Sequence, residues 1–355
     1  MRLAFRPLIV SGRFVLAVCA AAAQDAAAID ACKSGWGREA AHIRPATERI
    51  EATDQTVEAA MARLERNARE ECRQWADKAF EEFERSTYRE PFENGKYIVS
   101  GDIAIAGREQ LREFFETRIQ QDAAEPIPGA LIVHRVGKRD AIWDPVQRKR
   151  LTYCVSSAFG GRQERVAADM HAAAGAWERA ADVDFIHVPS EDGDCTAANP
   201  NVLFDIRPVN VNGQYLARAF FPNEPRPERN VLIDESAFLM DPGAALQLVG
   251  ILRHELGHVL GWRHEHTRPE SGTCFEDNDW RPLTDYDRFS VMHYPQCNGG
   301  GDWSLNLTHQ DRNGAACVYG PAPGFEVDPK ICPGPVSLRT GLRIEWEDEG
   351  LGIED

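Results

Sequence analysis

The segment HELGHVLGWRHEH, which begins at His254, holds four of the ten histidines of the chain and restricts its fold more than any other stretch. His254 and His258 are four residues apart, so on an α-helix they lie on one face, one turn apart. Gly261 follows three residues later, where a left-handed glycine can end the helix and turn the chain toward His264. The segment therefore predicts a three-histidine metal centre at the end of a helix.

Three histidines favour a catalytic zinc ion over a structural one. Structural zinc sites close with four protein ligands and favour cysteine, whereas three histidines leave one coordination position for water. Glu255 points aside from the His254–His258 pair and can hydrogen-bond such a water without becoming a ligand. The pattern H-E-x-x-H-x-x-G-x-x-H should arise by chance in fewer than about one in a thousand chains of this composition. His266 is predicted to be a surface or supporting group.

The N-terminal sequence is typical of a secretory signal. Arginines at positions 2, 6 and 13 precede an apolar run from Phe14 to Ala23, which is too short to span a bilayer. We therefore predict a signal peptide in residues 1–23 and an exported protein that is secreted, periplasmic or at the cell surface. A short buried helix is the alternative for this run. Lipid anchoring at Cys19 is a lesser alternative to a free exported protein, because valine stands where lipoprotein signals usually carry Gly or Ala.

Cysteine number and net charge restrict the chemistry further. Removal of the signal would leave eight cysteines, at positions 32, 72, 154, 195, 274, 297, 317 and 332. An even number in an exported chain predicts disulfides, and a thiolate metal site would favour closer C-x-x-C pairs. The net charge of −16 argues against nucleic acid as a partner, because binding to a phosphate backbone needs clustered Lys and Arg. No prediction about oligomeric state follows.

The remaining chain divides into three predicted regions. Residues 24–130 form an N-terminal region, read as a helical pro-region or spacer, in which a strand, a turn and a short helix follow Lys96. Residues 131–320 are the predicted catalytic domain, in which strand and helix signals alternate from Leu151, and residues 321–355 form a peripheral tail. The order of these signals predicts an α+β fold with a mixed sheet backed by two helices. The expected strands are LTYCVSS, VDFIHV, NVLFDIRPV, YLARAFFP and NVLIDES, and the expected helices are ERVAADMHAAAGAWERAA and ALQLVGILRHELGHVLG.

The histidine segment resembles the zinc signature of the metzincin metalloproteases, and EHTRPE at 265–270 is similar to its extension in the astacin branch. SVMHY at 290–294 resembles the Met-turn of that branch. The resemblance covers roughly residues 145–320 and implies a mixed, mostly parallel sheet, two long helices and a Met-turn C-terminal subdomain. It implies that Met292 forms an apolar floor beneath the imidazoles. It also implies that Tyr294 is a switchable fifth zinc ligand that stabilises the transition state.

The subfamily stays open. Trp262 stands where astacins usually carry Phe, Pro269 and Glu270 stand where they usually carry Asp and Arg, and YLARAFFP is similar to the edge strand of the matrixin branch. In the astacin pattern Glu265 contacts the new amino terminus of the processed enzyme. An edge strand at Tyr215–Pro222 is predicted to pair with an extended peptide substrate, and an internal strand is the alternative.

VSGDI at 99–103 is similar to the F-x-G-D pro-segment motif of astacins, with valine in place of phenylalanine. The aspartate of that motif occupies the zinc position that water later takes, which implies a latency switch at Asp102. An ordinary turn aspartate is the alternative.

Together these features predict a secreted zinc-dependent endopeptidase, with one catalytic Zn²⁺, Glu255 as general base and protein or peptide substrates. A secreted binding protein on an inactive protease scaffold and a zinc hydrolase of non-peptide substrates are the alternatives. The acidic loops at 190–195 and 298–302 are possible Ca²⁺ sites, for which solvated turns are the alternative.

Overall fold

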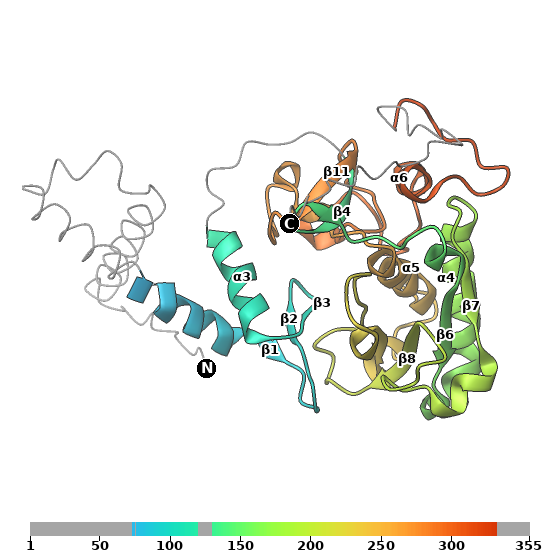
Figure 1. Cartoon of the computed structure of the whole chain (residues 1–355), viewed down its shortest axis with the longest axis horizontal. Helices are drawn as coiled ribbons and strands as arrows, with labels where there is room; N and C mark the ends of the chain where they lie inside the picture. Colours follow the sequence, from blue (N-terminus) through green and yellow to red (C-terminus); the bar gives the residue numbers. More distant parts are fainter. Residues whose placement is uncertain (1–72, 75, 120–129, 332–355) are drawn as a thin grey trace, which may run out of the picture. The chain divides into compact units, whose positions relative to one another are not determined.

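The computed structural model describes residues 73–74, 76–119 and 130–331 (Figure 1). The chain divides between Thr87 and Tyr88 into two units, and residues 76–86 of the first unit are helical. The predicted signal peptide, with Cys19, lies outside the described residues, as does the tail from position 332 onward. Among the described helices, none combines the length and the apolar character needed to cross a membrane.

A five-stranded sheet organises the second unit. Its strand order is β7 (Phe185–His187), β6 (Leu151–Val155), β8 (Phe204–Val209), β10 (Asn230–Asp234) and β9 (Ala217–Arg218). β6 pairs in parallel with β7 and β8, and β8 pairs in parallel with β10, whereas β9 is antiparallel to β10. The sheet is therefore mixed and mostly parallel, as predicted. The strand expected at Tyr215–Pro222 is an edge strand, although only two of its residues form the ladder.

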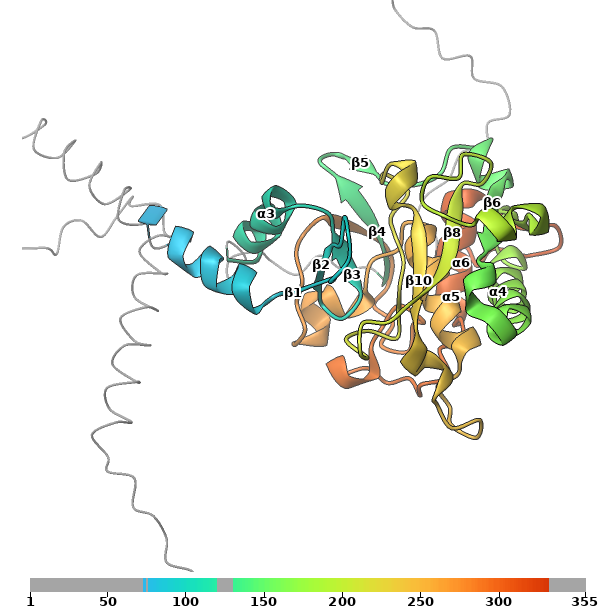
Figure 2. The same ribbon diagram turned by 90° about the horizontal axis from the view of Figure 1, so that it is seen from below.

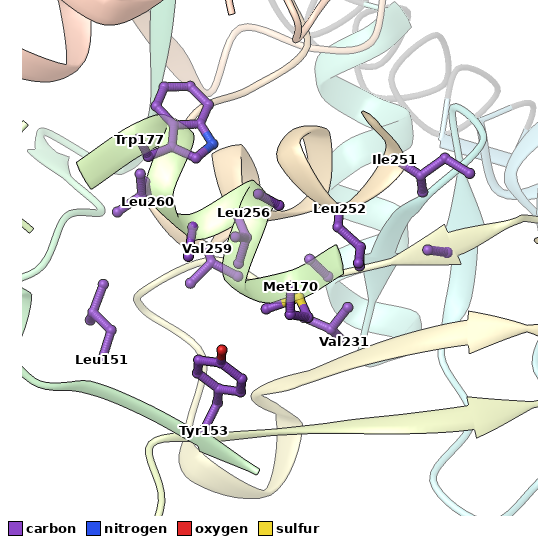
Figure 3. Close-up of a cluster of buried hydrophobic side chains, with 14 of the residues drawn as sticks. Leu151, Tyr153, Met170, Trp177, Val231, Ile251, Leu252, Leu256, Val259 and Leu260 are labelled. Atoms are coloured by element: carbon purple, nitrogen blue, oxygen red, sulfur yellow. The ribbon is translucent and has the colours of Figure 1, made fainter. Parts of the chain in front are cut away.

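Helices α4 (Gln163–Glu178) and α5 (Leu248–Val259) lie together against one face of this sheet (Figure 2). Buried side chains of both helices, such as Met170 and Leu256, share one apolar core with Tyr153 and Val231 of the sheet (Figure 3). Each fully buried side chain of this kind contributes roughly 1.5–3 kcal/mol to folding. This core fixes α5, and with it the histidines on that helix.

The start of α5 differs from the prediction. The expected helix ran from Ala245, but Gln247, the residue before Leu248, has extended backbone angles, and its side-chain amide donates to the carbonyl oxygens of Asp241 and Ala244. The Pro242–Gly243 turn places these carbonyls within reach, because Asp241 Oδ1 accepts a hydrogen bond from Gly243 N at 2.8 Å. Local side-chain bonds therefore replace the first helical turn.

The remaining described elements of the second unit are two smaller sheets, two α-helices and short 3-10 helices. Strands β1 (Tyr88–Arg89), β2 (Tyr97–Val99) and β3 (Ile103–Ile105) form an antiparallel sheet, and α3 (Arg108–Ile119) follows it. The predicted strand, turn and helix after Lys96 are confirmed, and a second strand, β3, that was not predicted lies between the turn and the helix. A second antiparallel sheet contains β11 (Trp280–Thr284), β4 (Ala130–Val136) and β5 (Arg139–Asp140), and α6 (His309–Tyr319) lies near the end of the described chain. The short 3-10 helices are η1 (Gln147–Lys149), η2 (Ser157–Arg162), η3 (Pro189–Asp194), η4 (Arg226–Glu228), η5 (Glu235–Phe238), η6 (Glu265–Thr267), η7 (Pro269–Ser271) and η8 (Pro295–Cys297).

Two disulfides join segments that are distant in sequence. Cys154 in β6 is bonded to Cys195 after η3, and Cys274 is bonded to Cys297, with sequence separations of 41 and 23 residues. Closing loops of this size stabilises the folded state by about 3–4 kcal/mol each in the chain-entropy view. Cys317 is also disulfide-bonded. The disulfide prediction is confirmed for these five cysteines, and positions 32, 72 and 332 lie outside the described residues.

Candidate metal centre

Helix α5 ends where the sequence predicts. Gly261 has φ +94°, its N–H donates to His258 O at 2.8 Å, and Trp262 N–H donates to Gly257 O at 2.9 Å. This pair of bonds around a left-handed residue is a Schellman helix ending. A Cβ at position 261 would lie 2.3 Å from Ala141 O, so the site excludes side chains as well as requiring a left-handed backbone. The chain then turns back and brings His264 to α5.

The three predicted ligand imidazoles meet through their Nε2 atoms. His264 Nε2 lies 3.1 Å from His254 Nε2 and 3.2 Å from His258 Nε2. A tetrahedral zinc ion with bonds of 2.0–2.1 Å has ligand–ligand edges of about 3.3 Å, so this spacing fits one ion. His254 Nδ1 and His258 Nδ1 each lie 2.7 Å from a backbone carbonyl oxygen, of Val291 and of Trp262. Because a carbonyl only accepts, Nδ1 carries the proton and the lone pair of Nε2 is free for a metal.

His264 is oriented by a carboxylate that the sequence analysis missed. Its Nδ1 lies 2.5 Å from Glu276 Oε1, and Glu276 Oε2 accepts from Arg263 Nη2 at 2.9 Å. Burial alone would raise the pKa of Glu276, but the charge and hydrogen bond of His264 outweigh burial and hold that pKa well below its usual range. A charged carboxylate on the outer nitrogen of a metal-binding histidine fixes the ring and increases its basicity.

Asp102 lies at the fourth corner of the histidine group. Its Oδ1 is 3.0 Å from His264 Nε2, and its Oδ2 is 3.2 Å from His254 Nε2. All four side chains are buried, and their ligand atoms lie within 4.8 Å of one another. Burial would raise the pKa of Asp102, but His264 and His254 lower it well below its usual range. Gly101 precedes it with φ +101°, and a Cβ there would lie 3.0 Å from Tyr294 Oη.

Glu255 is buried beside the imidazoles, and its Oε2 has no hydrogen-bond partner within the described chain. Burial raises the pKa of Glu255 well above its usual value, and the negative charge of Asp102 adds to the effect. The side chain borders a cavity of about 290 Å³, whose lining also includes Asp102, His254, Tyr215 and Ala217. An unpaired carboxyl group on a cavity wall is suited to bind and deprotonate a water molecule.

Tyr294 faces Asp102. Its hydroxyl donates to Asp102 Oδ2 at 2.6 Å, and its ring lies against the rings of His254 and His264, with centroid distances of 5.4 and 4.7 Å. The hydroxyl of Tyr294 therefore points to the position that Asp102 occupies.

His266 was predicted to be a surface or supporting group, and it is buried in a supporting position. Its Nε2 lies 3.3 Å from Glu276 Oε1, and its Nδ1 accepts from Tyr294 N–H at 3.2 Å.

Met292 is fully buried beneath α5. A Cβ on Gly257 would lie 2.3 Å from Met292 Sδ, so the thioether packs directly on the helix between the two ligand histidines. The turn that carries Met292 is fixed by Asp311 in the first turn of α6, which accepts from Ser290 Oγ at 2.5 Å and from Val291 N at 2.9 Å. The methionine thus gives the histidine-bearing part of α5 an apolar contact.

Glu265 is fully buried, and only one of its oxygens is well paired. Oε1 accepts from Asp287 N at 3.1 Å and from Arg268 Nη1 at 3.4 Å, whereas Oε2 has no partner among the described residues. Burial raises the pKa of Glu265 well above its usual value.

The acidic loops at 190–195 and 298–302 are not among the groups of potential metal ligands found in the described residues. Asp192 accepts instead from Val155 N at 2.8 Å, and Asp302 Oδ1 accepts from Ser304 N at 3.0 Å. Asp302 thus makes the local backbone bond of a turn, which is the solvated-turn alternative, whereas Asp192 bonds the backbone of β6, 37 residues away in sequence.

Comparison with known proteins bears on the same segment. The family model for the matrixins matches residues 143–271, which include α4, the edge strand and all three histidines of the group. A comparison with curated proteins finds no match. The matrixin match supports a metzincin-type, zinc-dependent metalloprotease that acts on peptides, and it does not support the astacin branch in particular. Glu276, Met292 and Tyr294 lie beyond the matched residues.

Proposed function

We propose that this chain is the latent form of an exported zinc endopeptidase, with His254, His258 and His264 as the zinc ligands. The observation that carries the proposal is the convergence of three Nε2 atoms at spacings that fit one tetrahedral ion. Fixed partners on the Nδ1 atoms, a backbone carbonyl for His254 and for His258 and the Glu276 carboxylate for His264, strengthen it, because they leave each Nε2 to face the shared position. The pro-region would comprise residues 24–130 and the catalytic domain residues 131–320.

A zinc ion bound there supplies Lewis acidity, which polarises a peptide carbonyl and lowers the pKa of water to about 7. Glu255 accepts the proton of the attacking water at its unpaired Oε2 and returns it to the departing amine. Tyr294, once Asp102 has left, can donate a hydrogen bond from its hydroxyl to the oxyanion that develops. The edge strand β9 pairs with an extended substrate, which positions the scissile bond over the cavity at Glu255.

Asp102 explains latency in the same scheme. Its two oxygens take the position between the imidazoles that water needs, and one of them also accepts the hydroxyl of Tyr294. One side chain thus blocks both the nucleophile and the oxyanion donor. Removal of the pro-region would free both positions. The unpaired, buried Oε2 of Glu265 offers a hydrogen-bond acceptor to the ammonium group of a new amino terminus.

Hydrolysis of a quenched fluorescent peptide library tests this proposal. The protein is trimmed with a protease, and the Glu255→Ala variant is measured beside the parent at equal zinc content. We expect hydrolysis by the parent and none by the variant. Absence of hydrolysis by both proteins would contradict the endopeptidase proposal and favour a binding protein on an inactive scaffold. Equal rates in both would exclude Glu255 as the general base.

A further inference from the structure

A buried ion pair links the proposed pro-region to the edge strand. Glu90 follows β1 and is only 3% exposed. Arg218 of β9 donates to both of its oxygens, from Nε to Oε1 at 2.6 Å and from Nη2 to Oε2 at 2.9 Å. Tyr215 adds its hydroxyl to Oε1 at 2.6 Å, and Lys96 N–H donates to Oε2 at 2.9 Å. Three of these four donors belong to the proposed catalytic domain.

The guanidinium of Arg218 is positioned independently of Glu90. Its Nη1 donates to Asn230 Oδ1 of β10 at 2.8 Å, and the side chain is only 2% exposed. Asn230 therefore holds one corner of the planar group, while the opposite edge, Nε and Nη2, faces Glu90. Such a preset fork matches the two oxygens of a carboxylate. The geometry would persist after the pro-region is removed.

The same group borders the proposed path of the substrate. Tyr215 lines the cavity that also contains Asp102, His254 and Glu255, and Arg218 lies on the edge strand itself. A peptide bound along β9 would therefore place one of its side chains near the Nε and Nη2 donors of Arg218. Glu90 shows that these two donors bind a carboxylate side chain.

We propose that Arg218 and Tyr215 form a carboxylate-binding subsite that selects an acidic side chain, Glu or Asp, in the peptide substrate. This inference rests on the proposed function. In the latent chain Glu90 occupies the subsite, and removal of the pro-region leaves two charge-assisted donors for the substrate. Asp102 and Glu90 thus block the metal centre and a specificity pocket at the same time.

Two other carboxylates are potential competitors for Arg218. Lys96 Nζ lies 3.1 Å from Glu228 Oε2 and 3.9 Å from Glu224 Oε2, so the pro-region also neutralises these groups. When Lys96 leaves, Glu224 or Glu228 could turn toward Arg218 and fill its free edge. A preference for acidic peptides would then be absent, so the cleavage experiment separates the two outcomes.

The test uses processed protein and pairs of quenched peptides that differ by Glu or Gln at one position, moved stepwise along the sequence. At one position we expect kcat/KM to be about 10- to 100-fold higher for Glu, as for loss of a charge-assisted bidentate pair. Arg218→Gln should remove this preference, so that the Glu and Gln peptides are cleaved with equal kcat/KM. Tyr215→Phe, which loses only the hydroxyl, should reduce the preference several-fold. Arg281→Gln is the matched control, because Arg281 pairs with Asp140 in the second sheet and should leave the preference intact.

Binding provides a second readout that does not depend on turnover. Fluorescence anisotropy with processed Glu255→Ala protein should show the same preference for the Glu peptide in Kd. This measurement does not use the Arg218→Gln variant, so it tests the subsite even if that variant fails to fold. Equal kcat/KM and equal Kd for Glu and Gln at every position, with hydrolysis intact, would overturn the subsite alone. A Glu preference that survives in folded Arg218→Gln would also overturn it. Absence of hydrolysis from every peptide would instead overturn the proposed function.

Discussion

The carboxylate behind His264 allows a quantitative test of the metal centre. Glu276→Gln keeps the shape of the side chain and one acceptor oxygen but removes the negative charge. Glu276 Oε1 is the partner of His264 Nδ1 at 2.5 Å and also lies 3.3 Å from His266 Nε2. The substitution therefore weakens the support of one predicted ligand without changing any of the three ligands.

The expected magnitude follows from the role of such partners. Replacing the carboxylate behind a metal-binding histidine typically reduces metal affinity about 10- to 100-fold. This corresponds to about 1.4–2.7 kcal/mol of zinc binding free energy. Glu276 also pairs with Arg263, whose second partner is Asp277 Oδ2 at 2.7 Å. Asp277→Asn is therefore the matched control, because it removes one carboxylate charge from Arg263 without touching His264.

Zinc affinity is measured by competition with a chromophoric chelator at pH 7.5, after circular dichroism has shown that both variants fold. We expect Kd to rise about 10- to 100-fold in Glu276→Gln and to stay close to the parent value in Asp277→Asn. Equal Kd values in the two variants would refute the reasoning, because the effect would then belong to Arg263 and its surroundings.

Three further predictions concern latency, rate and pH. Asp102→Ala should release activity in the unprocessed chain and abolish the lag before hydrolysis, and an unchanged lag would contradict the latency role. Tyr294→Phe in processed protein should lower kcat about 100- to 1,000-fold at unchanged zinc content, whereas a rate within a few-fold of the parent would exclude an oxyanion role. Burial, followed by the charge of Asp277, raises the pKa of Asp279 to about 6. The folded state therefore binds this proton more tightly than the unfolded state, and stability falls as pH rises from about 4 to 6. Asp279→Asn should raise the free energy of unfolding at pH 7.5 by about 1–2 kcal/mol, less than the full equivalent of the shift because solvent partly screens the half-buried carboxyl. Urea titrations should show this difference between variant and parent vanish near pH 4, and a variant equal to the parent at both pH values would show that the carboxyl is solvated.

Much of the fold was predictable because its signals are local. The spacing of His254 and His258, the glycine at 261 and the alternation of apolar residues in the strands are periodic features of short segments. The short ladder of β9 was not predictable, since the number of paired residues depends on the register with β10. The sequence also could not indicate where η6 and the neighbouring loops bring their side chains.

The supporting residues of the site were missed for the same physical reason. Glu276 belongs to a loop of acidic residues with no spacing relation to the histidines, and only the tertiary fold brings it to His264. Glu90 and Arg218 are 128 residues apart, and neither stands in a recognisable motif. Asp102 could be singled out only through resemblance to a pro-segment motif, and its distance from the imidazoles needed the structure.

The disulfide between Cys274 and Cys297 has a consequence for maturation. Cys274 stands two residues before Glu276, and Cys297 stands three residues after Tyr294, so one covalent bond anchors both the carboxylate behind His264 and the turn that presents the phenol. While these thiols are reduced, both segments can move away from the imidazoles independently of each other. Oxidation should therefore precede tight metal loading. Reducing agents would then inactivate the protein by a route distinct from chelation, because they release the supports of the metal rather than the metal itself.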